Sequence, residues 1–192
     1  MTAVPLDRVS WPLRTARLAL RPATGDDLRA LFDIHSLPEV GYWETEQPTS
    51  YAAFVLRSGE RGQLARTLAI DLEGVVIGDL YLRVSDAWSQ EDTADRAGEE
   101  AEIGWCVSPA HQGRGHATEA AGELVRACFE DLGVRRVTAA AFAANHPSLR
   151  IMERLGMRRE SYNVRDSLHR DLGWVDGVGY ALLAEEWREL HR

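Results

Sequence analysis

The chain has 192 residues, of which 45% are apolar and 27% are charged, and its formal net charge is −8. This composition is typical of one globular domain with its own core and excludes wholesale disorder, so we expect a single domain over residues 1–192. The acidic balance argues against a nucleic-acid partner. All 22 Lys and Arg positions are arginine, which excludes both a Schiff-base lysine and a lysine-containing phosphate loop.

The cysteines and the N-terminal segment indicate the cellular compartment in which the protein is expected. Cys106 and Cys128 form no C-x-x-C motif, so we expect two buried core thiols and no metal site. Residues 1–12 lack the apolar segment of a signal peptide. The longest apolar run, residues 139–144, is far shorter than the ~20 residues of a membrane span. We therefore expect a soluble, cytoplasmic protein without membrane partners, and the arginine- and alanine-rich composition indicates a GC-rich bacterial genome.

The predicted elements of the first half begin with a strand over residues 17–21, where polar and apolar residues alternate. A helix capped by Thr24 and a second helix over residues 50–62 follow. Strands 64–71 and 75–84 then form a hairpin around a Glu-Gly turn. Residues 85–100 carry six carboxylates and one arginine and are expected to form an exposed acidic loop, whose contact with a substrate stays open.

The second half alternates strands and helices, which is typical of an α/β protein with a mixed sheet. The most regular helix covers residues 117–132, with Gly133 as its C-terminal stop. Strands are expected over 101–107, 136–143, 157–168 and 174–183, and a further helix over 145–156.

A glycine-containing turn joins the strand 101–107 to the most regular helix. Gly113 and Gly115 remove two side chains from the start of this helix, so that an anion can approach backbone N–H groups at the positive end of the helix dipole. Arg114 adds a guanidinium beside it. The turn therefore predicts a phosphate or pyrophosphate site, with a purely structural glycine turn as the alternative.

The hexapeptide Gln112-Gly113-Arg114-Gly115-His116-Ala117 matches Q/R-x-x-G-x-G/A, and the chain thereby resembles the GNAT superfamily of N-acetyltransferases. Residues 15–22, 102–105, 117–120, 145–148 and 155–157 resemble its ribosomal-protein N-acetyltransferase-like branch, and the resemblance covers about residues 13–187. It implies a mixed, largely antiparallel seven-stranded sheet, flanked by about four helices and splayed at the fourth and fifth strands.

The resemblance implies acetyl-CoA, or another acyl-CoA, as co-substrate. The pyrophosphate would bind the turn and the pantetheine arm would lie along the strand that ends at Val107, whose amide would stabilise the oxyanion. The cofactor-binding residues implied in this way are Cys106, Val107, Gln112, Gly113, Arg114, Gly115, His116, Ala117, Thr118, Asn145 and Ser148.

Three residues are candidates for the chemistry: Ser148 as general acid, Glu102 as general base and Val107 as oxyanion donor. Each side chain has a plain structural alternative, because Ser148 can be a first-turn helix residue and Glu102 can pair with an arginine. Asn145, likewise, can act only as an N-cap.

The acceptor end is expected to include Tyr42, Trp43, Glu44 and Glu46 from one stretch and Tyr162 and His169 from the final hairpin. Aromatic walls with carboxylates suit an ammonium group.

The predicted function is N-acetyl transfer from acetyl-CoA to a primary amine of a protein N-terminus or small molecule, by direct attack in a ternary complex. The alternatives are a non-catalytic acyl-CoA sensor and, with little support, a dinucleotide oxidoreductase; the sequence leaves the acceptor, the acyl preference and a homodimer open.

Overall fold

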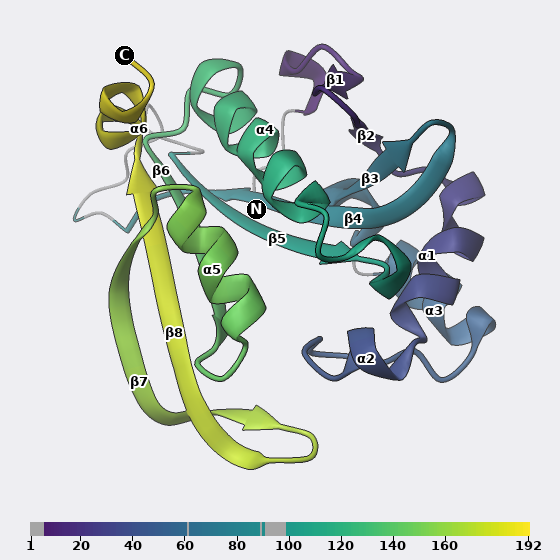
Figure 1. Cartoon of the computed structure of the whole chain (residues 1–192). Helices are drawn as coiled ribbons and strands as arrows, with labels where there is room; N and C mark the ends of the chain where they lie inside the picture. The colour runs from purple at the N-terminus through teal and green to yellow at the C-terminus, as the bar shows by residue number, and fades with distance from the viewer. Residues whose placement is uncertain (1–5, 61, 89, 91–98) are drawn as a thin grey trace. The chain divides into compact units, whose positions relative to one another are not determined.

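The computed structural model describes residues 6–60, 62–88, 90 and 99–192. Its strands and helices are labelled in Figure 1. The strands are β1 (Leu13–Arg14), β2 (Ala19–Pro22), β3 (Thr67–Leu72), β4 (Val75–Ser85), β5 (Glu100–Val107), β6 (Arg136–Phe142), β7 (Arg158–His169) and β8 (Gly173–Leu183). The helices are α1 (Leu28–His35), α2 (Pro38–Gly41), α3 (Tyr51–Glu60), α4 (His116–Glu130), α5 (His146–Arg154) and α6 (Ala184–Leu190).

The strands are hydrogen-bonded in the order β1-β2-β3-β4-β5-β6-β8-β7. Neighbours pair antiparallel at β1–β2, β2–β3, β3–β4, β6–β8 and β7–β8, whereas β5 and β6 run parallel. The ladder between β5 and β6 covers only Glu100–Glu102 on β5 and Arg136–Thr138 on β6. The expected mixed sheet is confirmed. The strands that pair only at their beginnings are β5 and β6, which become the fourth and fifth when the two-residue β1 is left out.

The sequence underestimated the number of elements. Within the described ranges the structure has eight strands where seven were expected and six helices where about four were expected. The additional elements are the two-residue strand β1, the single turn α2 and the seven-residue helix α6. Such short elements do not complete enough periods for a hydrophobic pattern to reveal them. Most of the predicted acidic loop, residues 91–98, lies outside the described residues.

The contacts divide the chain into two compact units, which are described separately. The loop unit comprises residues 10–81 and 105–123, and the hairpin unit comprises residues 1–9, 82–104 and 124–192. Strands β4 and β5 and helix α4 each contribute residues to both units. No helix in the described ranges is long and apolar enough to cross a membrane.

The loop unit has its helices α1 to α3 beside the sheet formed by β1 to β4 (Figure 1). One apolar cluster joins Ala23, Leu31 and Ala69, with Phe54 of α3 packed against it. The start of α1 is fixed to β2 because both Arg21 Nη atoms donate to the Asp27 carboxylate at 2.7 Å.

This hydrogen-bonded pair is formed by charges that are partly removed from water. The Arg21 hydrogen bonds, with those from Thr24, outweigh burial and lower the pKa of Asp27 to about 2. The pair therefore remains ionised throughout the neutral pH range, so that the direction of α1, and with it the position of His35 at its last turn, does not change with pH there.

The hairpin unit contains the parallel start of β5 and the antiparallel strands β6, β8 and β7. The β7–β8 hairpin extends far beyond α5 in Figure 1. Its register shifts between Asn163 and Ser167, where Arg165 adopts a φ of 52°. Asp176 on β8 accepts hydrogen bonds from Tyr162 Oη and Arg165 N, which hold this irregular segment on the opposite strand.

Candidate functional site

The turn before α4 exposes backbone N–H groups as the sequence predicts. After β5 the chain makes a 3-10 turn at Pro109–His111 and continues into α4 at His116. Gly113 and Gly115 have φ values of 72° and 82°, in the left-handed region that glycine adopts without strain. A Cβ built on Gly113 would meet no atom within 4 Å. Residues 112–115 are exposed, so the start of the helix is open to an anion.

Side chains from the turn fix its shape. Gln112 Nε2 donates to the carbonyl oxygen of Val107 at 2.8 Å, which joins the turn to the end of β5. The His116 ring is only 4% exposed, and its Nδ1 lies 3.2 Å from the carbonyl oxygen of His111. His116 therefore supports the turn with its side chain and can offer only its backbone to an anion.

Glu119, in the first turn of α4, connects the glycine turn to the start of the chain. Its Oε2 accepts from Arg17 Nε at 2.7 Å, and its Oε1 accepts from Thr15 Oγ1 at 2.6 Å. Arg17 also donates from Nη1 to the carbonyl oxygen of Arg114 at 2.9 Å. One guanidinium therefore neutralises the only acidic side chain in this turn of the helix and holds the backbone of the loop.

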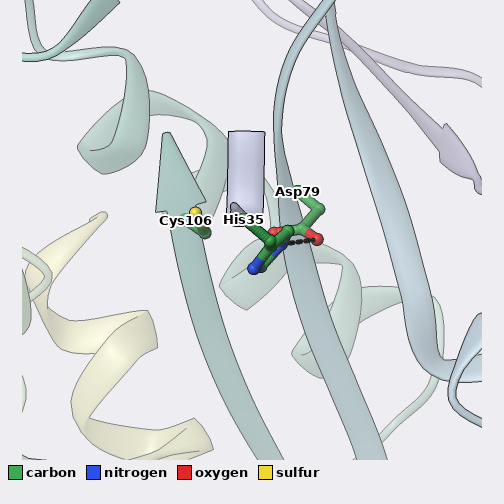
Figure 2. Close-up of side chains that lie close together, drawn as sticks. All are labelled: His35, Asp79 and Cys106. Atoms are coloured by element: carbon green, nitrogen blue, oxygen red, sulfur yellow. Dashed lines mark hydrogen bonds and ion pairs between the residues drawn. The ribbon is translucent and has the colours of Figure 1, made fainter. Parts of the chain in front are cut away.

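A second group of polar side chains lies in the same unit, at the end of β5. Figure 2 shows the side chains of His35 of α1, Asp79 of β4 and Cys106 of β5 close together. His35 Nε2 and Asp79 Oδ2 are 2.8 Å apart and form a hydrogen-bonded ion pair. The strands come close here because of Gly78: a Cβ on it would lie 2.2 Å from the Cys106 carbonyl oxygen and 2.9 Å from Val107 Cα.

The surroundings of this cluster determine its charges. Burial lowers the pKa of His35, but the Asp79 carboxylate and, less strongly, Glu44 outweigh it and raise that pKa to about 9. Burial raises the pKa of the Cys106 thiol well above its usual range, and the carboxylates of Asp79 and Glu44 add to this effect. At neutral pH the cluster therefore holds an imidazolium and a protonated thiol.

Glu44 completes the group from the segment that follows α2. Burial raises the pKa of Glu44 to about 7, with the His35 cation acting to lower it and Asp79 to raise it. Its side chain is half-buried, and no hydrogen bond to its carboxylate occurs within the described ranges. Glu44 is thus a carboxylate that can gain or lose a proton close to neutral pH.

The ligand-type atoms of His35, Asp79 and Cys106 all lie within 4.8 Å of one another. A hydrogen bond joins two of these residues, His35 and Asp79, and burial favours the protonated thiol of Cys106. We therefore interpret the group as an acid–base cluster.

The structure places the predicted site residues in both units. Cys106, Val107, the 112–117 turn and Thr118 belong to the loop unit, and Glu102, Asn145 and Ser148 belong to the hairpin unit. Asn145 is 8% exposed and caps α5, because its Oδ1 accepts from Ser148 N at 3.3 Å. Glu102 Oε2 lies 2.5 Å from Arg83 Nη2, so it forms the ion pair that was its structural alternative.

The residues expected at the acceptor end have different surroundings. Tyr42 and Trp43 form an edge-to-face pair with ring centroids 4.7 Å apart, and Glu46 pairs with Arg57. His169 is 2% exposed and its Nδ1 accepts from the amides of Asp171 and Leu172. Its ring therefore holds the tip of the hairpin, while Tyr162 is exposed on β7.

Sequence reasoning missed His35 and Asp79 as functional candidates. In the sequence, His35 falls within the helix expected after Thr24, and Asp79 falls within the strand expected over residues 75–84. The available signal was a polar residue at a position where the hydrophobic pattern requires burial, once on α1 and once within the run Ile77-Gly78-Asp79-Leu80.

Comparison with known proteins identifies the family. The model of the acetyltransferase (GNAT) domain matches residues 17–158. YnaD, an N-acetyltransferase of Bacillus subtilis, is 37% identical over 86 residues, which are 45% of this chain and 50% of YnaD. YdaF of the same organism, provisionally assigned as a ribosomal N-acetyltransferase, is 32% identical over 117 residues, 61% of this chain and 63% of YdaF.

A solved GNAT-family acetyltransferase from Bacillus anthracis superposes with a TM-score of 0.75 at 27% identity, covering 90% of this chain and 98% of that one. The matched part of the chain spans about half to two thirds of the two Bacillus subtilis relatives. Because the domain match covers most of the chain, the chain belongs to the GNAT acetyltransferase family, whose members use acetyl-CoA.

Proposed function

We propose that this protein is an acyl-CoA-dependent N-acetyltransferase that transfers the acetyl group of acetyl-CoA directly to a primary amine in a ternary complex. The observation that carries the proposal is the exposed turn at the start of α4, with two glycines at positive φ and an arginine between them. This is the arrangement that a pyrophosphate requires: several converging N–H groups, the positive end of a helix dipole and no obstructing side chain.

The donor would bind through the backbone. The amides of residues 112–118 would hold the pyrophosphate, with Arg114 beside it, and the pantetheine arm would lie along Cys106 and Val107. The N–H of Val107 would donate to the oxyanion that forms when the thioester carbonyl is attacked, and a positioned donor of this kind contributes about 10²–10³ to the rate.

The state of the cysteines supports direct attack by the amine. An acyl-enzyme route through a cysteine needs a thiolate nucleophile. Burial raises the pKa of Cys106 well above its usual range, and it raises the pKa of Cys128, which is completely buried, to about 12. Both thiols therefore remain protonated at neutral pH, and neither is suited to carry the acetyl group.

The family resemblance supplies two further residues. One is proposed to contact the donor, and the other is proposed to protonate the leaving group. Asn145 would contact the donor, and Ser148 would act as the acid that protonates the CoA thiolate. Because a thiol pKa of about 8.5 makes the thiolate a good leaving group, the contribution of Ser148 would be modest.

The acceptor class is a primary amine of a protein N-terminus or of a small molecule. The similarity to YdaF supports a ribosomal-protein N-terminus as one acceptor to test. The aromatic pair Tyr42–Trp43 and the carboxylate of Glu44 support a cationic group as the part of the acceptor that is recognised.

The test combines donor binding with a panel of acceptors. Acetyl-CoA at one hundred times its Kd should stabilise the protein by about 2.7 kcal/mol, and NAD or ATP should do so much less. Free thiol should then be released when peptides with free N-termini, amino acids or polyamines are added. Absence of a thermal shift with saturating acetyl-CoA would overturn the donor assignment, and binding without thiol release would instead support a non-catalytic acyl-CoA sensor.

A further inference from the structure

We propose that the carboxylate of Glu44 takes up the proton that the acceptor ammonium must lose before it can attack, and that the His35–Asp79 ion pair positions this carboxylate. The inference rests on the proposed N-acetyltransferase function and assigns its general base. It concerns only residues of the loop unit.

The packing of the loop unit brings the cluster together. Ile34 of α1, Val40 of α2 and Cys106 of β5 form one buried apolar cluster. The two helices are thereby held at the end of β5. His35 follows Ile34 on α1, and Glu44 lies in the segment after α2, four residues beyond Val40. A buried contact therefore anchors the helix from which the segment with Glu44 continues.

The cluster lies at the place where the thioester is proposed to react. Gly78 brings β4 against Val107, since a Cβ on Gly78 would be 2.9 Å from Val107 Cα. Asp79 is the next residue on β4, and Cys106 precedes Val107 on β5. A proton acceptor in this cluster is consequently close to the proposed oxyanion donor, as the base for an attacking amine has to be.

Within the cluster only Glu44 is suited to accept a proton. His35 is an imidazolium, because the neighbouring carboxylates hold its pKa at about 9, and its Nε2–H is directed to Asp79. Asp79 is occupied by this hydrogen bond, and Cys106 retains its thiol proton. Glu44 has a pKa of about 7 and a carboxylate without a hydrogen bond in the described part of the chain. A base with this pKa is about half ionised at neutral pH.

The chemical step is balanced without a further reactant. The acceptor R–NH₃⁺ transfers one proton to the Glu44 carboxylate, and the nitrogen lone pair forms a bond to the thioester carbonyl carbon. When the tetrahedral intermediate collapses, the C–S bond breaks and its electron pair leaves with sulfur. The thiolate takes a proton from the general acid proposed above, and the second nitrogen proton restores that acid. This gives CoA–SH and the N-acetyl amide, and Glu44 returns its proton to water.

The His35 cation gives the proposal a specific signature. It faces Glu44 from α1 and lowers the pKa of this carboxylate, while Asp79 acts from β4 in the opposite direction. Removing the cation should therefore raise the pKa of Glu44. A residue that was only structural would change the amount of folded enzyme but would not move a pH profile.

The decisive experiment measures kcat/KM for an accepted amine against pH with the whole chain and saturating acetyl-CoA. For the wild type we expect the rate to rise with pH through about 7. Glu44→Gln should lower the rate at pH 8 at least about tenfold, within the range typical of a general base, abolish this rise and leave the KM for acetyl-CoA unchanged. The control Glu39→Gln removes an exposed carboxylate of α2 and should keep the wild-type profile.

His35→Gln tests the positioning pair. In this variant the rise of kcat/KM with pH should occur at a higher pH than in the wild type. A direct titration of the wild-type protein with ¹³C-labelled glutamate, assigned through its backbone, should place the Glu44 carboxyl transition near pH 7 and needs no variant to fold. A Glu44 transition below pH 5 would overturn the assignment of the base, and so would a Glu44→Gln enzyme whose kcat/KM rises with pH as in the wild type. Acetylation of an amine by the wild type would still support the proposed function in that case. If the wild type acetylates no amine, both proposals fail.

Discussion

The glycine turn at residues 112–117 and the acid–base cluster of His35, Asp79 and Glu44 lie in the same unit but are built in opposite ways. The turn uses consecutive residues and offers backbone N–H groups, whose availability depends on two positive φ values. The cluster uses side chains from α1, from the segment after α2 and from β4, and its function depends on their charges. The comparison separates a site whose function is fixed by conformation from one whose function is fixed by protonation.

The difference predicts separate responses to mutation and pH. A backbone site cannot be deleted by changing a side chain, but it can be obstructed. A protonation site can be disabled by replacing one carboxylate with an amide of nearly the same shape. Donor binding should consequently be sensitive to added side chains at the turn, and turnover to charge changes in the cluster.

The largest effect is expected from Gly115→Asp. It places a side chain at a φ of 82° and a negative charge where the pyrophosphate would meet the helix. Because like charges brought together cost several kcal/mol, the Kd for CoA should rise about 100-fold or more, as isothermal titration would show. Gly133→Asp is the matched control, with a φ of 71° at the other end of the helix, and it should leave CoA affinity unchanged. Affinity within threefold of wild type for Gly115→Asp would mean that the turn is only structural.

Ser148→Ala should have an intermediate effect. If Ser148 protonates the leaving thiolate, kcat should fall about tenfold, less than for most general acids because the thiolate is a good leaving group, with little change in the KM for acetyl-CoA. Steady-state kinetics per folded molecule, with the folded fraction taken from circular dichroism, measures this. Should only stability fall, Ser148 would be a first-turn residue that donates its amide to Asn145.

The smallest effect sharpens the contrast between Glu44 and Glu102, the carboxylate that the sequence offers as general base. Glu102 is paired with Arg83, and both side chains are more than one-third exposed. An exposed pair of this kind contributes about 0–1 kcal/mol to stability. Glu102→Gln should therefore change kcat/KM by less than about threefold and keep the pH limb near 7. If kcat/KM no longer rises with pH in Glu102→Gln but still rises in Glu44→Gln, the base is Glu102.

Much of this architecture could be predicted from the sequence, and the reason differs between elements. The strands β3 to β6 and β8 and the helix α4 repeat their apolar pattern over enough residues to be recognised, and the Gly113 and Gly115 spacing marks the turn directly. The strand β1 and helix α2 have two and four residues, too few for a period. The pairing of His35 on α1 with Asp79 on β4 joins residues 44 positions apart, and tertiary packing, which local sequence patterns do not reveal, brings them together.

The connection between Arg17, Glu119 and the carbonyl of Arg114 has a thermodynamic consequence. Because the segment before β2 holds the loop in shape, docking of this segment and occupancy of the loop are linked equilibria, and each must strengthen the other by the same factor. A bound donor should slow hydrogen exchange at residues 15–18, which make no proposed contact with it. Conversely, removing residues 15–17 should weaken donor binding, so the affinity of the loop is set partly by residues that precede β2.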